Sequence, residues 1–391
     1  MSSLNFMEKL LDGVDVEWKP LGEVADYEQP TKYLVHTSNY RDEYVIPVLT
    51  AGKTFILGYT DETTGVYKAS LSPVIIFDDF TTANKWVDFD FKAKSSAMKM
   101  ITSADESSFL LRYIYHWMNN LPNEMADGDH KRQWISNFAN KLIPIPPLQI
   151  QAEIVRILDT FTELTAELTA ELTARKKQYT YYRDQLLTFE EGEVEWKSLG
   201  EVGDIRMCKR ILKEQTTDVG DIPFYKIGTF GKEANAYISK ELFNEYKSKY
   251  NYPKVGEVLI SASGTIGRAV IFDGRDAYFQ DSNIVWIEND ESQVLNKYLF
   301  YFYQIAKWEI ADGGTIQRLY NDNLKKTKLP VPYPNDRKKS LAEQARVIAI
   351  LDKFDALTTS LTEGLLREIE LRQKQYEYYR EMLLTFPKVG E

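Results

Sequence analysis

The sequence predicts an α+β chain in which two strand-rich globular domains are separated by two long antiparallel helices that form a coiled coil. Three observations predict this fold: a duplication along the whole chain, helical periodicity in two long segments, and short β-rich runs in the blocks between them. Repeated frames around unlike blocks are typical of a molecule with pseudo-twofold symmetry. Because each frame leads into the next, we expect a nearly circular arrangement in which the two ends of the chain meet.

The duplication consists of three short motifs that each occur twice, in the same order. The first motif recurs almost unchanged, the second keeps the residues Ile-Leu-Asp, and the third keeps Tyr-Tyr-Arg. The pairs are 16–24 (VEWKPLGEV) and 194–202 (VEWKSLGEV), 154–161 (IVRILDTF) and 347–354 (VIAILDKF), and 178–189 (QYTYYRDQLLTF) and 375–386 (QYEYYREMLLTF). The blocks that these motifs enclose barely resemble each other.

Two segments, Gln149–Phe189 and Ser340–Phe386, carry the apolar spacing of long helices. Apolar residues recur at steps of three, four and seven, and proline-rich stretches precede both segments. At about 1.5 Å per residue the helices would be roughly 60 and 70 Å long, which favours packing against each other as a coiled coil. Gly364 is a weak point inside the second helix.

A four-residue repeat lies inside the first helix. Residues 163–174 read ELTAELTAELTA, and a step of four residues keeps successive leucines on one face of the helix. Between the second and third duplicated motifs there are 16 residues in the first copy and 20 in the second. The two copies therefore differ by one insertion of the size of this repeat.

The boundaries of the motifs divide the chain into parts. Met7–Leu11 looks like a detached final turn of the helix that precedes the first motif. Each globular block contains β-rich runs, at 53–59, 73–77, 258–261 and 283–287, followed by a helical stretch, at 107–119 and 293–307. The expected parts are an N-terminal helical segment (1–15), domain 1 (16–143), a first helical spacer (144–193), domain 2 (194–329) and a second helical spacer (330–391).

Composition narrows the possible functions. The 391 residues include one cysteine, Cys208, and three histidines, so neither a disulfide framework nor a zinc cluster is expected. No apolar run approaches 18 residues, and we expect a protein of the reducing cytoplasm that does not bind membranes. The net charge of −10 argues against strong DNA binding by the isolated chain. Domain 1 has 13 basic and 17 acidic residues and domain 2 has 19 of each, so domain 2 is the more compatible with DNA.

Three motifs resemble enzyme sites, but one has a better explanation and the other two lack a required residue. Glu17-Trp-Lys19, with acids upstream, resembles a nuclease metal site, but the repeat of these residues at 195–197 favours the start of a strand. Gly52-Lys-Thr54 resembles the end of a phosphate-binding loop, but Pro47 stands where that loop needs a glycine. The Ile145-Pro-Pro-Leu148 stretch lacks the asparagine of a methyltransferase motif. We therefore expect no catalysis by this chain.

The duplicated frames, the proline-led helices and the Thr-Ala-Glu-Leu run resemble the specificity subunits of type I restriction–modification systems over nearly the whole chain. The resemblance implies that each domain recognises one half of a split, asymmetric site on double-stranded DNA. It also implies that the helices set the spacing of the half-sites and dock two methyltransferase subunits, which endonuclease/translocase subunits then join. S-adenosylmethionine, ATP and Mg would belong to those partners, and no cofactor or metal to this chain.

Candidate DNA contacts combine positive charge, amides and hydroxyls in loops. Arg132 and Arg318 are the strongest individual candidates, and solvated loops are an equally good explanation for any single residue. Gly264-Thr-Ile-Gly267 could serve the fold instead. The candidates are Lys53, Thr54, Tyr59, Thr60, Lys131, Arg132, Gln133 and Trp134 in domain 1, and Ser261, Ser263, Thr265, Arg268, Gln317, Arg318, Asn321 and Asn323 in domain 2.

The Tyr-Tyr-Arg clusters are candidate docking surfaces for two identical partners, because aromatic residues and arginine favour interfaces. Packing within the coiled coil explains them nearly as well. The two clusters are Tyr181, Tyr182 and Arg183, and Tyr378, Tyr379 and Arg380. A stand-alone DNA-binding regulator, a coiled-coil adaptor and an enzyme with an unfamiliar site remain the alternative functions.

Overall fold

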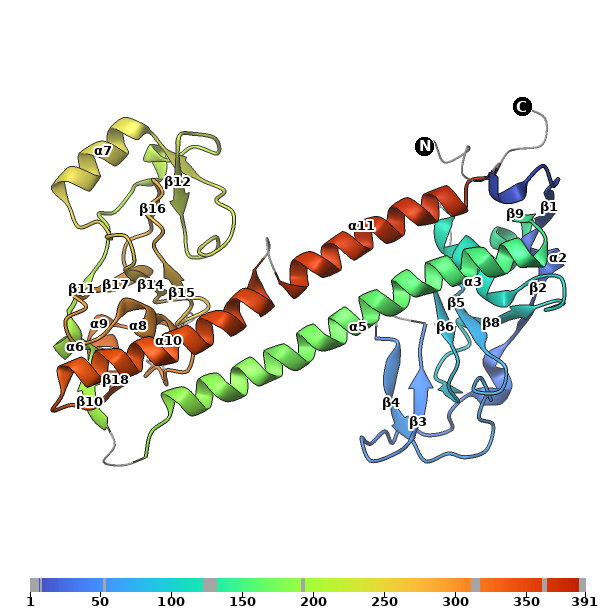
Figure 1. The fold of residues 1–391 in the computed structure, drawn as a ribbon, viewed down its shortest axis with the longest axis horizontal. Coiled ribbons are helices and arrows are strands. Elements are labelled where there is room, and N and C mark those ends of the chain that lie inside the picture. The colour runs from blue at the N-terminus through green and yellow to red at the C-terminus, as the bar shows by residue number, and fades with distance from the viewer. Residues whose placement is uncertain are drawn as a thin grey trace. The chain divides into compact units, whose positions relative to one another are not determined.

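The computed structural model describes residue 7 and residues 9–51, 54–121, 132–190, 194–310, 317–360 and 364–386. The chain forms two compact units (Figure 1). Unit 1 consists of residues 1–169 and 368–391, and unit 2 of residues 170–367. Among the described helices, none is both long and apolar enough to cross a membrane.

Unit 1 contains domain 1, whose strands are mostly short. The predicted run at 73–77 forms β5 and the run at 53–59 forms β4, one to three residues further on. The elements are β1 (Glu17–Pro20), α2 (Leu21–Val24), β2 (Ala25–Glu28), η1 (Pro30–Tyr33), β3 (Ile46–Leu49), β4 (Ile56–Thr60), β5 (Val74–Asp78), β6 (Asn84–Val87), β7 (Lys92–Ala93), β8 (Met98–Ser103), α3 (Leu111–Asn120), α4 (Gln133–Ser136), η2 (Phe138–Asn140) and β9 (Leu142–Ile145).

Unit 2 contains domain 2, which repeats most of this order: helix α7 has no counterpart in domain 1, and α9 alone stands where domain 1 has α4 and η2. The predicted strands at 258–261 and 283–287 form β14 and β17, and the predicted helix at 293–307 forms α8. The elements are β10 (Val194–Ser198), α6 (Leu199–Val202), β11 (Asp204–Arg206), η3 (Lys213–Gln215), β12 (Ile222–Tyr225), β13 (Tyr237–Ile238), α7 (Lys240–Lys249), β14 (Val258–Ser261), β15 (Ala269–Ile271), β16 (Tyr278–Phe279), β17 (Ile284–Glu288), α8 (Asn296–Tyr303), α9 (Asn321–Lys326) and β18 (Lys328–Pro332).

The two domains share one topology although their sequences differ. Each has a four-stranded sheet, of order β2-β8-β5-β6 in domain 1 and β11-β17-β14-β15 in domain 2. Each also has a three-stranded sheet, β4-β3-β7 or β13-β12-β16, whose central strand pairs antiparallel on one side and parallel on the other. The duplicated Val-Glu-Trp-Lys motif forms the first strand of a separate two-stranded sheet, β1-β9 or β10-β18, as its interpretation as a strand predicted.

The first long helix is confirmed, and the second is interrupted. α5 (Leu148–Leu187) runs for 40 residues without a break, but the predicted helix at 340–386 is two helices, α10 (Arg337–Thr359) and α11 (Leu365–Leu383) (Figure 1). Gly364, which directly precedes α11, has φ +79°, and a residue in the left-handed region cannot continue an α-helix. The interruption falls in the segment that carries four more residues than its counterpart in α5.

Within each unit, α5 packs against a helix that runs in the opposite direction. In unit 1, Phe161 stacks on Tyr379 of α11, with the ring centroids 5.1 Å apart. In unit 2, Phe354 of α10 stacks on Tyr182 at 5.5 Å. Each phenylalanine ends one copy of the Ile-Leu-Asp motif, and each tyrosine belongs to the other copy of the Tyr-Tyr-Arg motif. The predicted antiparallel coiled-coil contact is therefore made by duplicated residues in both units.

A buried glutamine joins each domain to its long helix. Gln151 at the start of α5 accepts a hydrogen bond from the Leu110 backbone N–H at 3.0 Å, just before α3, and donates to the carbonyls of Ser108 and Pro146. Gln344 of α10 repeats the arrangement, accepting from the Leu295 N–H at 2.9 Å, just before α8. Both glutamines are 0% exposed, so these bonds replace water that the backbone groups lost on folding.

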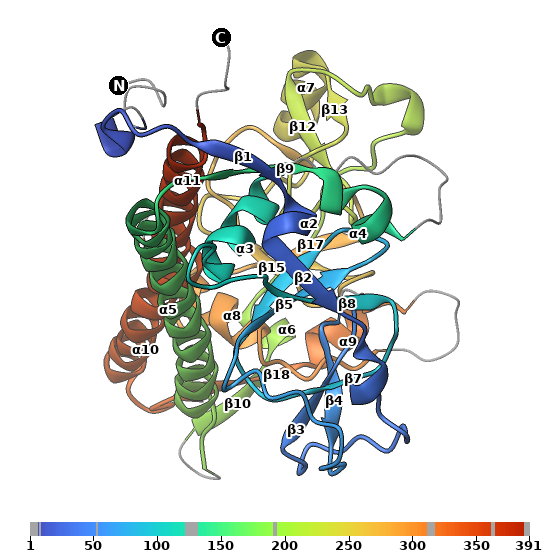
Figure 2. The same cartoon turned by 90° about the vertical axis from the view of Figure 1, so that its right-hand side faces the viewer.

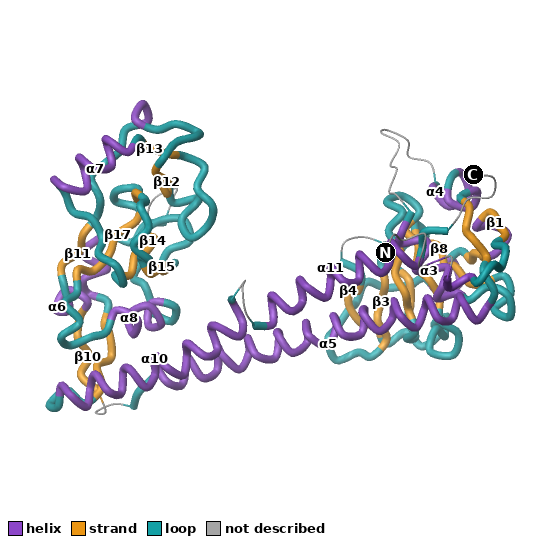
Figure 3. The backbone as a smooth tube through the Cα atoms, turned by 45° about the horizontal axis from the view of Figure 1, so that its top comes forward, coloured by secondary structure: helices purple, strands orange, loops and turns teal. Residues whose placement is uncertain are grey.

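An aspartate of the Ile-Leu-Asp motif makes a second, more exposed joint. Asp159 accepts hydrogen bonds from Arg112 and His116 of α3, both at 2.8 Å. Asp352 accepts hydrogen bonds from Lys297 at 2.7 Å and from Tyr301, both of α8. α3 thus lies between α5 and the sheet of unit 1 (Figure 2), and α8 between α10 and the sheet of unit 2 (Figure 3). Burial acts to raise the pKa of Asp159, but the bond from His116 and the charge of Arg112 outweigh it and hold the pKa below its usual value.

The N-terminal segment joins the core of unit 1. Met7 and Leu11 are buried in the same cluster as Leu383, Leu384 and Phe386, which follow the second Tyr-Tyr-Arg motif. The residues close to the two ends of the chain therefore meet, as the duplication predicted.

We predict that Gln151→Leu destabilises unit 1. The change leaves the Leu110 N–H and two carbonyls without their partner, and each unpaired buried group costs about 1–3 kcal/mol. The measurement is the urea midpoint of unfolding. Gln149→Leu, the same change at an exposed position of the same helix, is the control. Equal midpoints for the two variants would contradict the role given to Gln151.

Candidate nucleic-acid interface

Equivalent backbone hydrogen bonds identify one position that the two domains share. In domain 2, the Gln280 N–H donates to the Tyr225 carbonyl at 2.9 Å, and the Ala262 N–H to the Asn283 carbonyl at 2.7 Å. Domain 1 has the same two bonds, from Lys94 to Leu49 at 2.8 Å and from Asp79 to Ala97 at 3.0 Å. Gln280 therefore corresponds to Lys94, and Asn283 to Ala97.

The two arginines that the sequence favoured also occupy equivalent positions in the two domains. Arg132 and Arg318 each precede a residue whose N–H donates at 2.8 Å to the carbonyl that follows β5 or β14, namely that of Asp79 or Ala262. Arg132 lies 3.9 Å from the carboxylate of Asp79, which is buried. Arg318 donates to the Ser282 carbonyl at 2.9 Å and is partly buried. The structure therefore brings this pair of candidates to one site of the common fold.

In domain 2 this position is a pocket of about 340 Å³ whose lining is rich in positive charge. Arg210, Lys213, Lys226 and Arg318 contribute side chains, and among the described residues of the lining Asp281 is the one carboxylate. Asp281 is paired with Arg210 at 2.9 Å, so the pocket keeps a positive balance. Such a local concentration of cations is what phosphate binding requires, even in an acidic protein.

The loop at 261–268 contributes no side chain to the lining of this pocket but packs beside it. The Ser261 hydroxyl donates to the Thr265 carbonyl and accepts from the Arg268 N–H, and both Ser261 and Ser263 are buried. Arg268 donates to the Phe230 carbonyl at 2.8 Å, whereas Thr265 is exposed. Gly267 has φ +81°, and a Cβ there would collide with the ring of Trp308. The Gly-Thr-Ile-Gly stretch thus serves the fold.

The domain 1 candidates separate into buried and accessible residues. Trp134 is 1% exposed and packs edge-on against Phe77, and Thr60 is 0% exposed, so their side chains belong to the core instead of an interface. Tyr59 is partly buried on β4, where it pairs with Pro47. Thr54 is exposed and Gln133 partly exposed. Lys53 and Lys131 lie outside the described residues.

Three domain 2 candidates lie around α9. Gln317 and Asn321 are exposed. Asn323 donates its amide to the Glu309 carbonyl at 2.8 Å and is only partly exposed. Unlike Arg318, none of these three lines the pocket.

Most of the residues that line the pocket were not among the candidates predicted from the sequence. Arg210 and Lys213 belong to a basic run after Cys208 that could have been noticed. Lys226 is far along the chain from Gln280 and Asn283, and only the pairing of β12 with β16 brings it to them, so these residues carry no local signal.

The two Tyr-Tyr-Arg clusters have the same local structure. Arg183 lies over the ring of Tyr179 at 5.6 Å, and Arg380 over that of Tyr376 at 5.7 Å. The second tyrosine of each cluster packs on a phenylalanine in the coiled coil, whereas the first is more exposed, at 58% for Tyr181 and 53% for Tyr378. The packing explanation therefore fits one tyrosine of each pair and the docking explanation fits the other.

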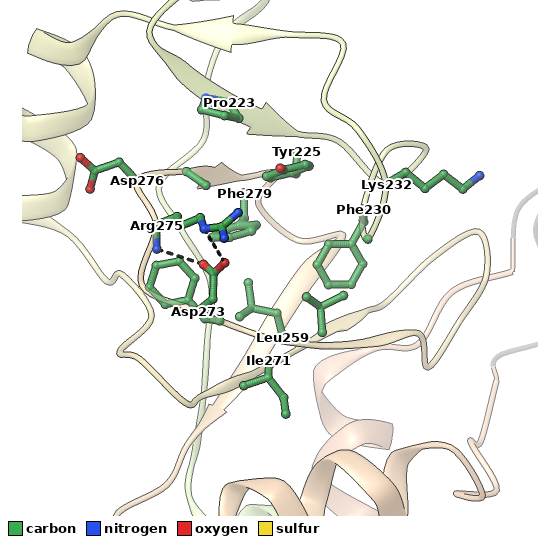
Figure 4. A pocket seen from close by; sticks show the side chains of 14 residues that line it. Pro223, Tyr225, Phe230, Lys232, Leu259, Ile271, Asp273, Arg275, Asp276 and Phe279 are labelled. Atoms are coloured by element: carbon green, nitrogen blue, oxygen red, sulfur yellow. Dashed lines mark hydrogen bonds and ion pairs between the residues drawn. The ribbon is translucent and has the colours of Figure 1, made fainter. Parts of the chain in front are cut away.

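A second pocket of domain 2 lies on the opposite face of β12 and is mainly apolar (Figure 4). Tyr225 stacks on Phe279 there, and Asp273 pairs with Arg275 at 3.3 Å. None of the described residues that line it is a histidine, cysteine or serine. Cys208 is buried elsewhere in domain 2, and burial raises the pKa of its thiol to about 12. In the described part of the chain, no group of three or more histidine, cysteine or acidic side chains could hold a metal.

Comparison with known sequences gives a consistent result. The family described as "Type I restriction modification DNA specificity domain" matches residues 13–175 and 191–371. The chain is 51% identical over 409 aligned residues to the specificity subunit of the EcoR124I/EcoR124II type I restriction enzyme of Escherichia coli, a match that covers 99% of this chain and 98% of the relative. A putative type I restriction enzyme specificity subunit of Haemophilus influenzae is 50% identical, covering 97% of this chain and 98% of its own.

Comparison with solved structures supports the fold. The S subunit of a type I restriction–modification system from M. genitalium matches with a TM-score of 0.62 at 13% identity, covering 96% of this chain and 98% of its own. A chain from a structure of type I restriction–modification complex assembly matches with a TM-score of 0.52 at 17% identity, over 95% and 98%.

We predict that Gly267→Ala disrupts domain 2. The substitution adds roughly 1–3 kcal/mol of backbone strain and about 1–3 kcal/mol of overpacking against Trp308. Thermal unfolding of the full chain measures the effect. Gly228→Ala is the control, because a Cβ at Gly228 meets no atom within 4 Å. Similar melting temperatures for the two variants would show that the loop tolerates a side chain.

Proposed function

Because the chain belongs to the type I restriction–modification DNA specificity family, we propose that it directs such a complex to DNA by reading one half of a bipartite site with each domain. The observation that carries this proposal is one position of the common fold that holds unlike side chains in the two domains. Gln280 and Asn283 line the pocket of domain 2, and Lys94 and Ala97 take their places in domain 1. Different donors at one position of a common fold would read different bases, so the site would be asymmetric.

Phosphate contacts would come from the cations at this shared position of the two domains. Arg132 in domain 1, and Arg210, Lys213, Lys226 and Arg318 in domain 2, are the cations that we assign to this role. Lys53 and Lys131 remain candidates from the sequence. Because the whole chain carries a net charge of −10, we expect it to bind DNA weakly until partners add their own basic surfaces.

The duplicated tyrosine clusters are the surfaces on which we propose that two methyltransferase subunits dock. The clusters share their exposure, the edge-to-face packing of their two tyrosines and the cation over the preceding tyrosine ring, and two identical partners need two such equivalent surfaces. Endonuclease/translocase subunits would join this complex in the cytoplasm. Adenine methylation with S-adenosylmethionine and ATP-dependent cleavage with Mg would reside in the partners, and this chain would be non-catalytic and hold no cofactor.

The alternatives explain less of the molecule. A stand-alone DNA-binding regulator conflicts with the acidic balance of the chain. A coiled-coil adaptor would give no reason for two domains that keep one topology and yet carry unlike side chains at one shared position.

The proposal is tested by expressing the chain with the methyltransferase subunit of its own system and sequencing the methylated genome. We expect a split, asymmetric motif with methylated adenine that appears only when both proteins are present. Methylation that does not need this chain, or none when both are present, would overturn the proposal. DNA binding by the purified chain alone at physiological salt would instead favour the regulator.

We predict that the helical repeat sets the gap between the half-sites. Deleting Thr169–Leu172 removes one repeat, about 6 Å of helix, which compares with a rise of about 3.4 Å per base pair. The methylated motif should keep both half-sites and change its gap by one or two base pairs. An altered half-site sequence in the deletion variant would contradict this role.

We also predict that the exposed tyrosine of each cluster contributes to docking. Tyr181→Ala or Tyr378→Ala should weaken the binding of one methyltransferase subunit, by more than about 1 kcal/mol if the residue is a hot spot. Native mass spectrometry of the complex should then show one bound subunit in place of two. Leu71→Ala, at an exposed apolar position of domain 1, is the control. Retention of two subunits by both tyrosine variants would exclude these surfaces.

A further inference from the structure

The pocket of domain 2 holds two amide side chains whose oxygens are already engaged. Asn283 Oδ1 accepts a hydrogen bond from the Ser263 hydroxyl at 2.9 Å. Gln280 Oε1 accepts one from the Ile227 backbone N–H at 2.9 Å. Within the described parts of the chain, neither amide nitrogen donates to a protein atom, and both side chains are only half-buried. Each residue therefore leaves its NH2 group available to a ligand, while its oxygen is held by the protein.

Most of the other polar groups of the pocket are donors as well. Arginine and lysine side chains only donate hydrogen bonds, and four of them line the pocket. Asp281, the carboxylate among the lining residues, is held by Arg210. The Thr216 hydroxyl donates to the Lys213 carbonyl at 2.8 Å and the Ser282 hydroxyl to the Asp281 carboxylate at 3.3 Å, so these two hydroxyls can only accept from a ligand. The two amides and four cations outnumber them, and a ligand that matches this pocket mainly brings acceptors.

Of the four bases, guanine alone presents two acceptors together, N7 and O6, at its edge in the major groove, whereas adenine pairs one acceptor with a donor. We infer that the Asn283 and Gln280 amides read the major-groove edge of a guanine in the half-site of domain 2, while the surrounding cations hold phosphates. This inference rests on the proposed function and adds to it a particular base and the groups that select it.

Domain 1 differs at these positions, so the inference is confined to domain 2. Ala97, the equivalent of Asn283, has no polar side chain, and Lys94, the equivalent of Gln280, donates to the Ser38 hydroxyl at 2.9 Å. Domain 1 has the charged Asp79 where domain 2 has Ala262, so no carboxylate stands at that position beside Asn283. The hydrogen bond from the Ser263 hydroxyl orients the Asn283 amide.

The test compares Asn283→Asp with the unchanged chain in complex with its methyltransferase subunit. Aspartate keeps the oxygen that accepts from Ser263 but removes the donor. By genome methylation, we expect one half-site to lose its selection for guanine at one position, with discrimination falling about 5- to 100-fold. The other half-site should be unchanged. Gln280→Glu, which likewise keeps the accepting oxygen and removes the NH2 donor, is a second variant in case the first does not fold. Lys213→Ala is the control.

The Lys213→Ala control should lower methylation at every site without changing the motif, because phosphate contacts carry no sequence information. A second arm measures binding of the unchanged complex to duplexes in which 7-deazaguanine, which lacks N7, replaces each guanine of the half-site in turn. One position should lose affinity. If Asn283→Asp changes affinity but not the motif, and methylphosphonate linkages weaken binding where 7-deazaguanine does not, the pocket holds only phosphate and the inference fails. A chain that directs no methylation at all would instead refute the proposed function.

Discussion

The buried glutamines at the start of the two long helices are the interaction on which both units depend. Gln151 and Gln344 each bind a backbone N–H and at least one backbone carbonyl of the segment that leads into the domain helix, and neither is exposed to water. Because an unpaired buried group is costly, the domain and its long helix cannot separate without losing these bonds. The Asp159 and Asp352 contacts, about two turns further along, fix the same helices a second time. Each domain is thus attached to its helix at two places by duplicated residues.

This attachment belongs to the part of the structure that the two units share, and the part in which they differ lies elsewhere in each domain. The frame consists of the two-stranded sheet, the long helix and the helix between it and the domain, and its contacts are nearly identical in the two units. Lys94 directly follows β7 and Gln280 directly follows β16, and the order of these strands in their sheets is common to both domains. Side chains at strand ends can change without altering the sheet, so one fold can carry two different sets of donors. The acidic balance of the chain is compatible with this arrangement, because the positive charge needed for DNA is concentrated in one pocket.

Much of the frame could be predicted from the sequence, because its signals are local or duplicated. α5 follows from an uninterrupted apolar stripe, and the strands of the Val-Glu-Trp-Lys motif follow from its repetition. The break between α10 and α11 was missed because the cost of one glycine in a helix is small, whereas the observed conformation of Gly364 has positive φ. Trp134 appeared in a polar sequence yet is buried against Phe77. Most of the domain 2 pocket could not be predicted, since Lys226 and Asn283 meet only through strand pairing.

The central claim is that two independent readers sit on one common frame, and exchanging one reader tests it most directly. Replacing Val24–Leu142 by the equivalent block of another family member exchanges the candidate DNA contacts of domain 1 and keeps Gln151, Asp159 and the whole of unit 2. The methylated motif of the resulting complex should differ from the original in one half-site and keep the other half-site. A motif in which both half-sites change would contradict the account, because the two domains would then not read DNA separately.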